Sequence, residues 1–562
     1  MNFQEIFFQT LTLIGGLAFF LFGMNVMGDG LTKVSGGRLE QVLERLTDNR
    51  IKAVLLGAGV TAVIQSSSAT TVTVVGFVNS GIMKLGQAVG IIMGANIGTT
   101  VTSWLLSLTG IESSNFFIRL LKPASFTPVL ALAGIVLIMT ARQEKRKDIG
   151  SILIGFSILM FGMETMSGAV EPLAEVPQFT NLLTMFSNPL LGMLAGALLT
   201  AVIQSSSASV GILQALCATG TVLYSAAIPI IMGQNIGTCV TALLSSVGAG
   251  KNAKRAALVH LYFNLIGTTV FMLVFYGLNQ IVHFNFMSHA VNVAGIAVIH
   301  SLFNIGATIL LLPFARYLEK LALLTVREDE EESVSEFARL DIRFLEMPAL
   351  ALEQCKHSAD EMAELVRQNI SESLDNIFSA KQGKKKMIEQ KEEKIDRYEE
   401  ELTDYLHKIS NHSLLPQNSD QLNMLLYCVR DLERISDHAC NIVDEALKMT
   451  KSKVVWPKKM MTELENYREE VRAIVNMTVE AFLKEDGQQA HEIEQKENTI
   501  DRINKRTKKQ TLKRVKKEKL SPEIGIFMNE LAINFERVAD HCENIAISLM
   551  GGTESDDGGA DE

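Results

Sequence analysis

Long apolar stretches interrupted by short polar islands fill roughly the first 318 residues, whereas the rest of the chain is strongly charged. A helix needs roughly 20 mostly apolar residues to cross a bilayer. Stretches close to that length predict seven spans, at about 7–28, 85–108, 116–140, 150–167, 226–248, 256–280 and 294–315. The charged part has helical periodicity. It predicts six long helices, at about 345–376, 380–409, 419–450, 461–485, 487–516 and 522–550.

The polar islands occur twice. The nine residues TAVIQSSSA stand unchanged at Thr61–Ala69 and Thr200–Ala208, and a second island follows each, GANIGTT at Gly94–Thr100 and GQNIGTC at Gly233–Cys239. Both pairs are 139 positions apart, so one structural unit has been duplicated without a gap. Two copies predict two half-sites that converge.

Each serine run is flanked by arms too short for a full span, Ile51–Ile64 and Ala69–Val78 in the first copy. This predicts a re-entrant hairpin that enters the membrane and returns on the same side. With the N-terminus outside, Lys and Arg then gather in the cytoplasmic loops 29–52, 141–149 and 249–256, as the positive-inside rule requires. Each copy makes three crossings, so the second is inverted relative to the first, an architecture of secondary transporters.

The charged part is itself duplicated. Glu433–His438 recurs as Glu536–His541, offset by 103, and Lys391–Arg397 recurs as Lys496–Arg502, offset by 105. Two three-helix bundles in tandem fit this pattern. The expected domains are a membrane domain at 1–318 with repeats at about 10–140 and 149–280, a linker at 319–340, a helical domain at 341–550 and an acidic, disordered tail at 551–562.

The serine islands have the chemistry of an anion site. Hydroxyls beside the free N–H groups of a helix start suit an oxyanion, yet the apolar core of the repeats has no Lys or Arg to balance its charge. A co-bound cation would solve this, and amide and hydroxyl oxygens suit sodium. Glu164 is the clearest residue for proton coupling instead. The alternative, that these polar residues only pack helices together, does not explain why both islands are duplicated.

Acidic pairs four residues apart mark the helical domain. Each pair shares one helical face and can chelate a cation; the pairs are Glu433 with Asp437 and Glu536 with Asp540. The alternative is that these carboxylates pair with neighbouring Lys or Arg on solvated helices.

These motifs resemble two families. The paired Gln-Ser-Ser-Ser and Asn-Ile-Gly-Thr motifs, over about residues 15–310, are similar to those of the type II sodium-phosphate cotransporters. The resemblance implies a substrate site lined by Gln65, Ser66, Ser67, Ser68, Gln204, Ser205, Ser206 and Ser207. It implies a sodium site shaped by Asn96, Thr99, Thr100, Asn235 and Thr238. Leu261 and Ser301 follow His residues where some animal relatives carry an acid, which leaves the sodium stoichiometry open.

Residues of about 340–550 resemble PhoU, a phosphate-signalling regulator with two three-helix repeats. The resemblance implies that Glu433, Asp437, Glu536 and Asp540 bind a divalent or iron-type metal. One resemblance is to a phosphate transporter and the other is to a phosphate-signalling regulator, so both parts of the chain indicate a function that involves phosphate.

The prediction is therefore an all-α, polytopic membrane transporter and not an enzyme: a sodium-coupled inorganic phosphate symporter of the inner or plasma membrane. The N-terminus lies outside and a PhoU-like regulatory domain lies in the cytoplasm. One alternative is a phosphate exporter or a carrier of another oxyanion, and another is a membrane-anchored phosphate-signalling regulator. Phosphate, sodium and the lipid bilayer are the expected partners, with a homodimer or a cytoplasmic signalling partner left open. The basic run Lys505–Lys519 lacks aromatic residues, which favours a solvated face or a lipid contact over nucleic acid.

Overall fold

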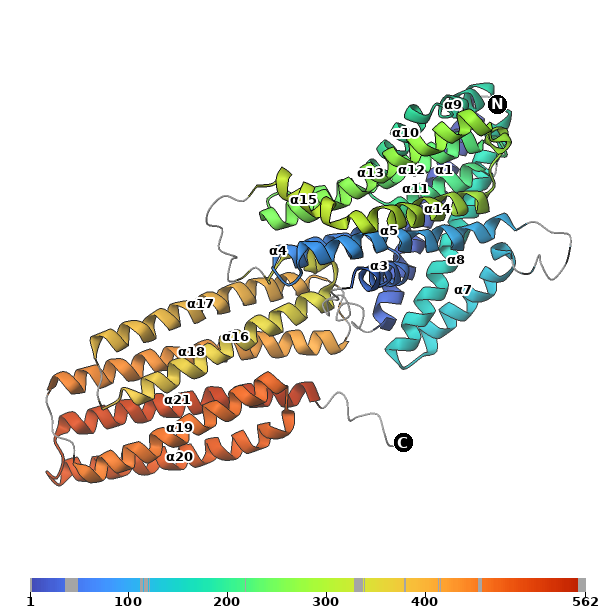
Figure 1. Cartoon of the computed structure of the whole chain (residues 1–562). Coiled ribbons are helices and arrows are strands. Elements are labelled where there is room, and N and C mark those ends of the chain that lie inside the picture. The colour runs from blue at the N-terminus through green and yellow to red at the C-terminus, as the bar shows by residue number, and fades with distance from the viewer. Residues whose placement is uncertain are drawn as a thin grey trace. The chain divides into compact units, whose positions relative to one another are not determined.

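The computed structural model describes residues 3–35, 49–111, 115, 120, 122–217, 219–327, 337, 339–378, 381–412, 414, 416–452 and 457–553. The chain divides into two compact units, Met1–Met347 and Pro348–Glu562 (Figure 1). Within the described residues every regular element is a helix, apart from one isolated β-bridge between Leu223 and Ala290. The predicted all-α fold is confirmed. Parts of the predicted linker (328–336 and 338) and of the predicted tail (554–562) lie outside the described residues.

The first unit contains the membrane spans. Its α-helices are α1 (Phe3–Ser35), α3 (Arg50–Ile64), α4 (Ser67–Asn79), α5 (Leu85–Ser107), α7 (Pro123–Thr140), α8 (Glu144–Val170), α9 (Pro177–Met185), α10 (Pro189–Ile203), α11 (Ser206–Cys217), α12 (Tyr224–Ser245), α13 (Lys251–Val282), α14 (Val293–Leu311) and α15 (Ala315–Thr325). Among the described residues, 7 helices are long and apolar enough to cross a membrane. They match the seven predicted spans, so the chain is a multi-pass membrane protein.

The duplication is exact at the level of helices. The segment α3–α4–α5 and the segment α10–α11–α12 have the same layout, and in each copy two helices approach backbone to backbone. A Cβ atom added to Gly94 on α5 would lie 2.0 Å from the Val54 carbonyl oxygen, and one on Gly233 would lie 1.9 Å from that of Met193. Small residues at such positions allow membrane helices to pack closely. The glycines of the second islands therefore allow α5 to pack closely on α3 and α12 to pack closely on α10.

Helices α1 and α8, which open the two copies, pack against each other in antiparallel directions. A Cβ on Gly16 would contact the carbonyl of Gly162, and one on Gly23 would contact the carbonyl of Gly155. Gly16 and Gly155 are equivalent positions in the repeat, as are Gly23 and Gly162. Equivalent residues thus exchange partners, which is the pattern of contacts across a two-fold axis.

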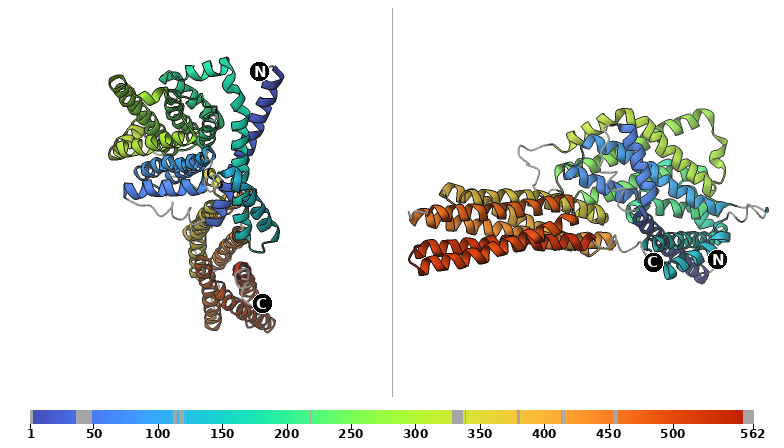
Figure 2. Two further views of the ribbon diagram at one scale, coloured as in Figure 1. Left: turned by 90° about the vertical axis from the view of Figure 1, so that its right-hand side faces the viewer. Right: turned by 90° about the horizontal axis from the view of Figure 1, so that it is seen from below.

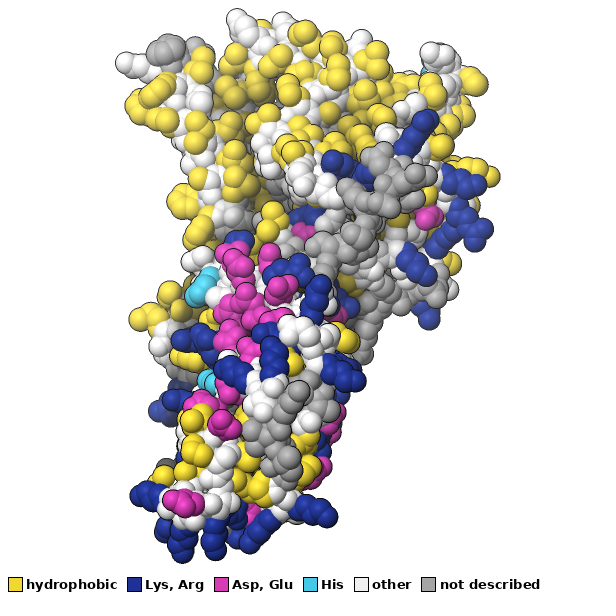
Figure 3. All heavy atoms as spheres, turned by 90° about the vertical axis from the view of Figure 1, so that its left-hand side faces the viewer, with side chains coloured by type: hydrophobic (Ala, Val, Ile, Leu, Met, Phe, Trp, Pro, Cys, Tyr) yellow, Lys and Arg dark blue, Asp and Glu magenta, His cyan; other side chains and the backbone are white. Residues whose placement is uncertain are grey.

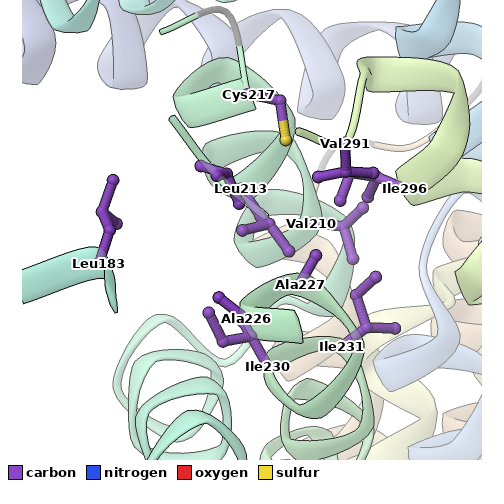
Figure 4. Close-up of a cluster of buried hydrophobic side chains, with 11 residues drawn as sticks. Leu183, Val210, Leu213, Cys217, Ala226, Ala227, Ile230, Ile231, Val291 and Ile296 are labelled. Carbon is purple, nitrogen blue, oxygen red and sulfur yellow. The ribbon is translucent and has the colours of Figure 1, made fainter. Parts of the chain in front are cut away.

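The first unit buries an apolar core and exposes an apolar surface. Figure 4 shows side chains of α11, α12 and the start of α14 pointing toward one another, among them Val210, Ile231 and Ile296. Large apolar side chains also face outward, for example Val202 at 74% and Leu273 at 71% exposure. In Figure 3 hydrophobic side chains gather over the first unit and charged ones over the second. An apolar exterior of this kind suits a bilayer as solvent.

The second unit consists of six long helices that run side by side (Figures 1 and 2). They are α16 (Pro348–Asp375), α17 (Gln382–Ser410), α18 (Pro416–Ser452), α19 (Lys458–Lys484), α20 (Gly487–Lys516) and α21 (Pro522–Thr553). All six match predicted helices. Helices α16–α18 pack together as one group and α19–α21 as another, with α18 also packing on α21. Apolar residues at helical spacing, such as Leu425, Leu432 and Val429 on α18, are fully buried.

The second unit begins at Pro348 rather than at residue 341, where the sequence placed the start of the helical domain. Residues 341–347 belong to the first unit because the short 3-10 helix η5 (Ile342–Glu346) packs against α4.

Candidate functional site

The serine islands form the turns of two helical hairpins, α3–α4 (hairpin 1) and α10–α11 (hairpin 2). In each, a glutamine ends the first helix in the left-handed conformation, Gln65 with φ 60° and Gln204 with φ 59°. Non-glycine residues with positive φ are uncommon and concentrate at functional sites. Across each turn a pair of hydroxyls is hydrogen-bonded: Thr61 donates to Thr70 at 3.1 Å, and its repeat equivalent Thr200 donates to Ser209 at 2.8 Å.

The first serine of each run caps the returning helix. The Ser66 hydroxyl oxygen accepts a hydrogen bond from the Ala69 N–H at 3.1 Å, and that of Ser205 accepts one from Ala208 at 3.2 Å. Capping satisfies one of the free N–H groups of the helix start. Ser66 and Ser205 therefore shape the turn, and the next serine of each run is the one placed at the start of the helix.

The two hairpins meet at these next serines. The Oγ atoms of Ser67 and Ser206 lie 3.5 Å apart, and the Ser68 hydroxyl donates to the backbone carbonyl of Gln204 at 3.4 Å. Both hydroxyls at the centre are buried, with Ser67 6% and Ser206 5% exposed. Two hydroxyls at this separation can both donate to one oxygen atom at the usual distance of about 2.7 Å. The two half-sites predicted from the sequence are brought together.

The electrostatics of this meeting point favour an anion. Helices α4 and α11 both begin there, at Ser67 and Ser206, and a helix start carries partial positive charge and free N–H groups. No basic residue lies in α4, α5, α10, α11 or α12. An anion held there would therefore rest on dipoles and hydroxyls, and its net charge would need a mobile cation.

The predicted sodium residues lie on α5 and α12, the helices that support the hairpins. All five are buried and donate back to a carbonyl of their own helix; they are Asn96, Thr99, Thr100, Asn235 and Thr238. In the threonines this donation uses the hydroxyl hydrogen, and in all five residues the side-chain oxygen keeps lone pairs that can accept. Gly98 and Gly237 bring these segments against Thr61 and Thr200 at the hairpins. The second islands are thus beside the serine turns in both copies.

The two glutamines of the site differ in their surroundings. Gln65 is buried, with 6% exposure; its Oε1 accepts a hydrogen bond from Thr102 at 2.7 Å, and its amide nitrogen donates to the Ala62 carbonyl. Gln204 is exposed. The equivalent of Thr102 is Thr241, whose buried Oγ1 has no partner within the described residues. Hairpin 1 is therefore fastened to its supporting helix by a side-chain hydrogen bond that hairpin 2 does not form.

Several buried polar oxygens near the second copy were not singled out from the sequence. Gln234 Nε2 donates to the Ser209 carbonyl at 3.0 Å, and Asn264 Nδ2 donates to Cys239 Sγ at 3.3 Å. The side-chain oxygens of Gln234 and Asn264 are buried without a partner among the described residues. Such oxygens are suitable cation ligands. Gln234 could have been found from the sequence, because it lies inside the island GQNIGTC. Glu164, the residue considered for proton coupling, is exposed on α8.

In the second unit each predicted acidic pair lies within a larger acidic group. Burial, reinforced by Asp437, raises the pKa of Glu433 to about 7. Burial and the same Asp437 raise the pKa of Glu392. In the second module, burial and neighbouring carboxylates raise the pKa of Glu497 to about 7. Glu392 and Glu497 were missed as site residues, although both stand in the repeated string offset by 105.

The predicted metal residues do not form a ready ligand set. Within the described residues no group of three or more His, Cys, Asp or Glu side chains is arranged to hold a metal ion. Instead Arg434 donates to Asp437 at 3.0 Å, and Lys508 donates to Glu536 at 3.1 Å. These contacts agree with the ion-pair alternative, and metal binding at these carboxylates stays a prediction.

Comparison with known families accounts for both units. The sequence profile of the Na+/Pi-cotransporter family matches twice, at residues 19–168 and 158–299. The profile of the PhoU domain also matches twice, at residues 359–446 and 464–549. The two matches of each profile follow the two internal duplications.

Three relatives share different parts of the chain. "Uncharacterized protein YqeW" of Bacillus subtilis is 31% identical over 45% of this chain and 78% of its own length. "Putative inorganic phosphate export protein YjbB" of Escherichia coli K12 is 23% identical over 88% of this chain and 89% of its own. The human "Sodium-dependent phosphate transport protein 2B" is 35% identical over 22% of this chain and 20% of its own.

Proposed function

Because this chain belongs to the Na+/Pi-cotransporter family and carries two PhoU domains, we propose that it moves inorganic phosphate across the cell membrane together with sodium. The observation that carries the proposal is the 3.5 Å approach of Ser67 and Ser206, which joins two duplicated helix starts into one site. The phosphate oxygens would accept hydrogen bonds from the paired serines and from the helix N–H groups. The protein performs no bond-breaking step in this scheme and acts as a carrier.

The hairpins are proposed to re-enter the membrane from opposite faces. The antiparallel packing of α1 on α8, with exchanged contacts between Gly16 and Gly162 and between Gly23 and Gly155, supports an inverted relation between the copies. Inverted repeats can present one central site alternately to the two sides of the membrane. In this arrangement the N-terminus faces outward, and the second unit, with its phosphate-regulatory fold, faces the cytoplasm.

Sodium is proposed as the coupling ion because the site needs a positive charge that the protein does not supply. Asn96, Asn235 and Thr238 are buried on the helices that support the hairpins, and the oxygens of Gln234 and Asn264, which have no partner among the described residues, add two more buried acceptors. Neutral oxygen ligands in a buried site suit an alkali cation. Bound sodium would offset the cost of burying the phosphate charge.

Export is the second candidate function, and the likeness to YjbB over both units favours it. The same site serves either direction, because a carrier runs down the combined gradient of its substrates. The direction therefore depends on the gradients and on regulation, not on which serines bind.

The test is flux in liposomes that contain the full-length protein. Radiolabelled phosphate should accumulate under an inward sodium gradient, and equal accumulation with potassium would contradict sodium coupling. Sulfate should compete weakly and arsenate strongly, because arsenate shares the charge and shape of phosphate. Loading the liposomes with phosphate and reversing the sodium gradient tests export. Flux without any dependence on sodium in either direction would leave a sodium-independent carrier instead.

A further inference from the structure

The segment Asp341–Met347, here called the strap, packs onto one face of α4, the returning helix of hairpin 1. Phe344 is 0% exposed, and its ring centre lies 5.3 Å from that of Phe77. Thr73 Oγ1 contacts the Met347 sulfur at 2.8 Å. Asn79 Nδ2 donates to the Asp341 carboxylate at 2.9 Å. Apolar and polar contacts together hold the strap along the second half of this helix.

The strap has a fixed internal structure of its own. Asp341 caps the short helix η5 by accepting the Arg343 backbone N–H at 3.0 Å, and it also accepts the Arg343 side-chain Nε at 2.6 Å. Both residues are 7% exposed. Removing one partner of a buried ion pair is strongly destabilising, because it leaves an uncompensated charge. The contact is therefore a built element and not a chance approach of a linker.

The surface that receives the strap exists only in the first copy. A Cβ on Gly76 would lie 2.7 Å from Phe344 Cε1, so the phenyl ring occupies the space that the missing side chain leaves. The position equivalent to Gly76 in hairpin 2 is Ala215, and that of Thr73 is Ile212. The duplicated helix α11 thus lacks both the cavity for the ring and the hydroxyl.

The strap links α4, the helix that begins at the serine turn, to the start of the second unit along the chain. Helix α4 begins at Ser67, and a helix of 13 residues is a rod about 20 Å long. The strap packs against the C-terminal half of α4. It ends at Met347, immediately before Pro348, where α16 begins. A movement of α16 would therefore act on the strap through a single peptide bond, and through the strap on the helix that carries Ser67.

We propose that the strap is an autoinhibitory restraint through which the second unit controls transport. Docked, it holds hairpin 1 in place and slows the exchange of the site between the two membrane faces. Withdrawn by a movement of α16, it frees the hairpin. This inference rests on the proposed transport function, and it predicts that undocking raises the flux.

The first experiment compares two strap variants of the full-length protein in liposomes. Phe344→Ala removes the buried ring and should raise phosphate flux severalfold. The matched control is Ile342→Ala, on the same strap but 67% exposed, which should transport like the wild type. Thermal unfolding of both variants verifies that they remain folded. A Phe344→Ala flux equal to or below that of the control would overturn the restraint.

The second experiment fixes the strap in its docked position. Thr73→Cys combined with Met347→Cys puts one thiol on each side of this contact, while the native cysteines are buried or half-buried. Oxidation should form the cross-link and suppress the flux, and a reductant should restore it, whereas each single cysteine variant should not respond. Undiminished flux in the cross-linked protein would overturn the proposal.

The outcome for the strap is separable from that for the carrier. The yield of the cross-link reports docking without any reference to cargo. If the wild type moves no phosphate with sodium, the proposed function fails whatever the cross-link yield. If the wild type transports and the cross-link leaves its rate unchanged, only the strap proposal fails.

Discussion

Hairpins 1 and 2 share their backbone and differ in what holds them. Both turns use a left-handed glutamine, a capping serine and a hydroxyl pair across the turn. Hairpin 1 is fastened twice, by Thr102 on Gln65 and by the strap on α4. Hairpin 2 has neither of these contacts, and Gln204 is exposed, but its returning helix is held by Gln234, which donates to the Ser209 carbonyl at 3.0 Å. The duplication preserved the serine turns that form the site, while the copies differ elsewhere, among other places in the contacts that hold each hairpin.

The second unit repeats this lesson. Its two modules carry the same acidic motif, yet Glu536 pairs with Lys508 of the neighbouring helix, whereas Glu433 is 3.4 Å from Arg434 of its own helix and lies beside Asp437, with its pKa raised to about 7. In both units the copies keep their fold and differ in how polar groups are satisfied. Four experiments test where the copies are equal and where they are not.

The largest effect is expected where the copies are equal in packing. Gly94→Ala and Gly233→Ala would each place a methyl group about 2 Å from a carbonyl oxygen of the facing helix. Overpacking costs about 1–3 kcal/mol when neighbours can shift, and a helix backbone shifts little. We expect both variants to lose most of their folded yield in detergent, as measured by size-exclusion chromatography. The control is Gly59→Ala on α3, which has open space around it. A normal yield for either island variant would contradict the packing.

The next effect concerns the serines at the centre. Removing one hydroxyl from a charge-assisted pair costs about 1.5–3 kcal/mol, which is about a ten- to a hundredfold loss of apparent affinity. Ser67→Ala and Ser206→Ala should therefore weaken phosphate uptake strongly and to a similar degree. Ser187→Ala, on a serine bonded to Ser225 in another part of the unit, is the control. If only one of the two variants loses phosphate uptake, the proposal that both serines bind the same phosphate ion is wrong.

A smaller and unequal effect is expected at the helices that support the hairpins. Thr102→Val removes the hydrogen bond to Gln65, worth about 1 kcal/mol, and should slow uptake by about fivefold. Thr102→Ser keeps the hydroxyl and should restore the rate. Thr241→Val removes a hydroxyl without a partner in the described part of the chain, so it should leave stability unchanged or raise it. Equal losses of uptake in Thr102→Val and Thr241→Val would contradict the proposed difference between the hairpins.

The smallest effect is expected in the acidic modules. Burial, together with Asp437, raises the pKa of Glu433 in the folded protein from its ordinary value of 4.5 to about 7. As the pH rises through this window the unfolded chain releases the proton first, so the folded state loses stability. Glu433→Gln should raise the melting temperature by a few degrees above pH 7 and leave it unchanged below pH 4.5.

The matched variant in the other module is Glu536→Gln. It breaks the contact with Lys508, which is about one-third exposed on both sides, and pairs of this kind contribute little. Its melting temperature above pH 7 should fall slightly or stay unchanged. A rise as large as that of Glu433→Gln would show that the two modules are electrostatically alike.

Much of the fold was predictable because it follows from local periodicity. The seven apolar stretches and the six amphipathic helices were located correctly, although helices such as α1 and α8 extend beyond the predicted stretches, since burial in lipid or in a bundle fixes which positions are apolar. The exact 139-residue offset also predicted that Ser67 and Ser206 belong to one site. The strap was missed, and its residues were assigned to the helical domain. Phe344 and Gly76 are far apart in sequence, and the local sequence around either residue does not indicate that the two are in contact.

The sequence by itself determined the helices, the duplications and the polar groups available for an anion, since each of these is written in spacing along one chain. Only the tertiary structure decided that the two serines lie 3.5 Å apart and that the strap packs on hairpin 1. It also decided that Thr102 donates a hydrogen bond to Gln65, while the Thr241 hydroxyl has no partner among the described residues. The physical reason is that duplicated sequences specify equal local structure, whereas contacts between distant segments depend on single side chains in which the copies differ.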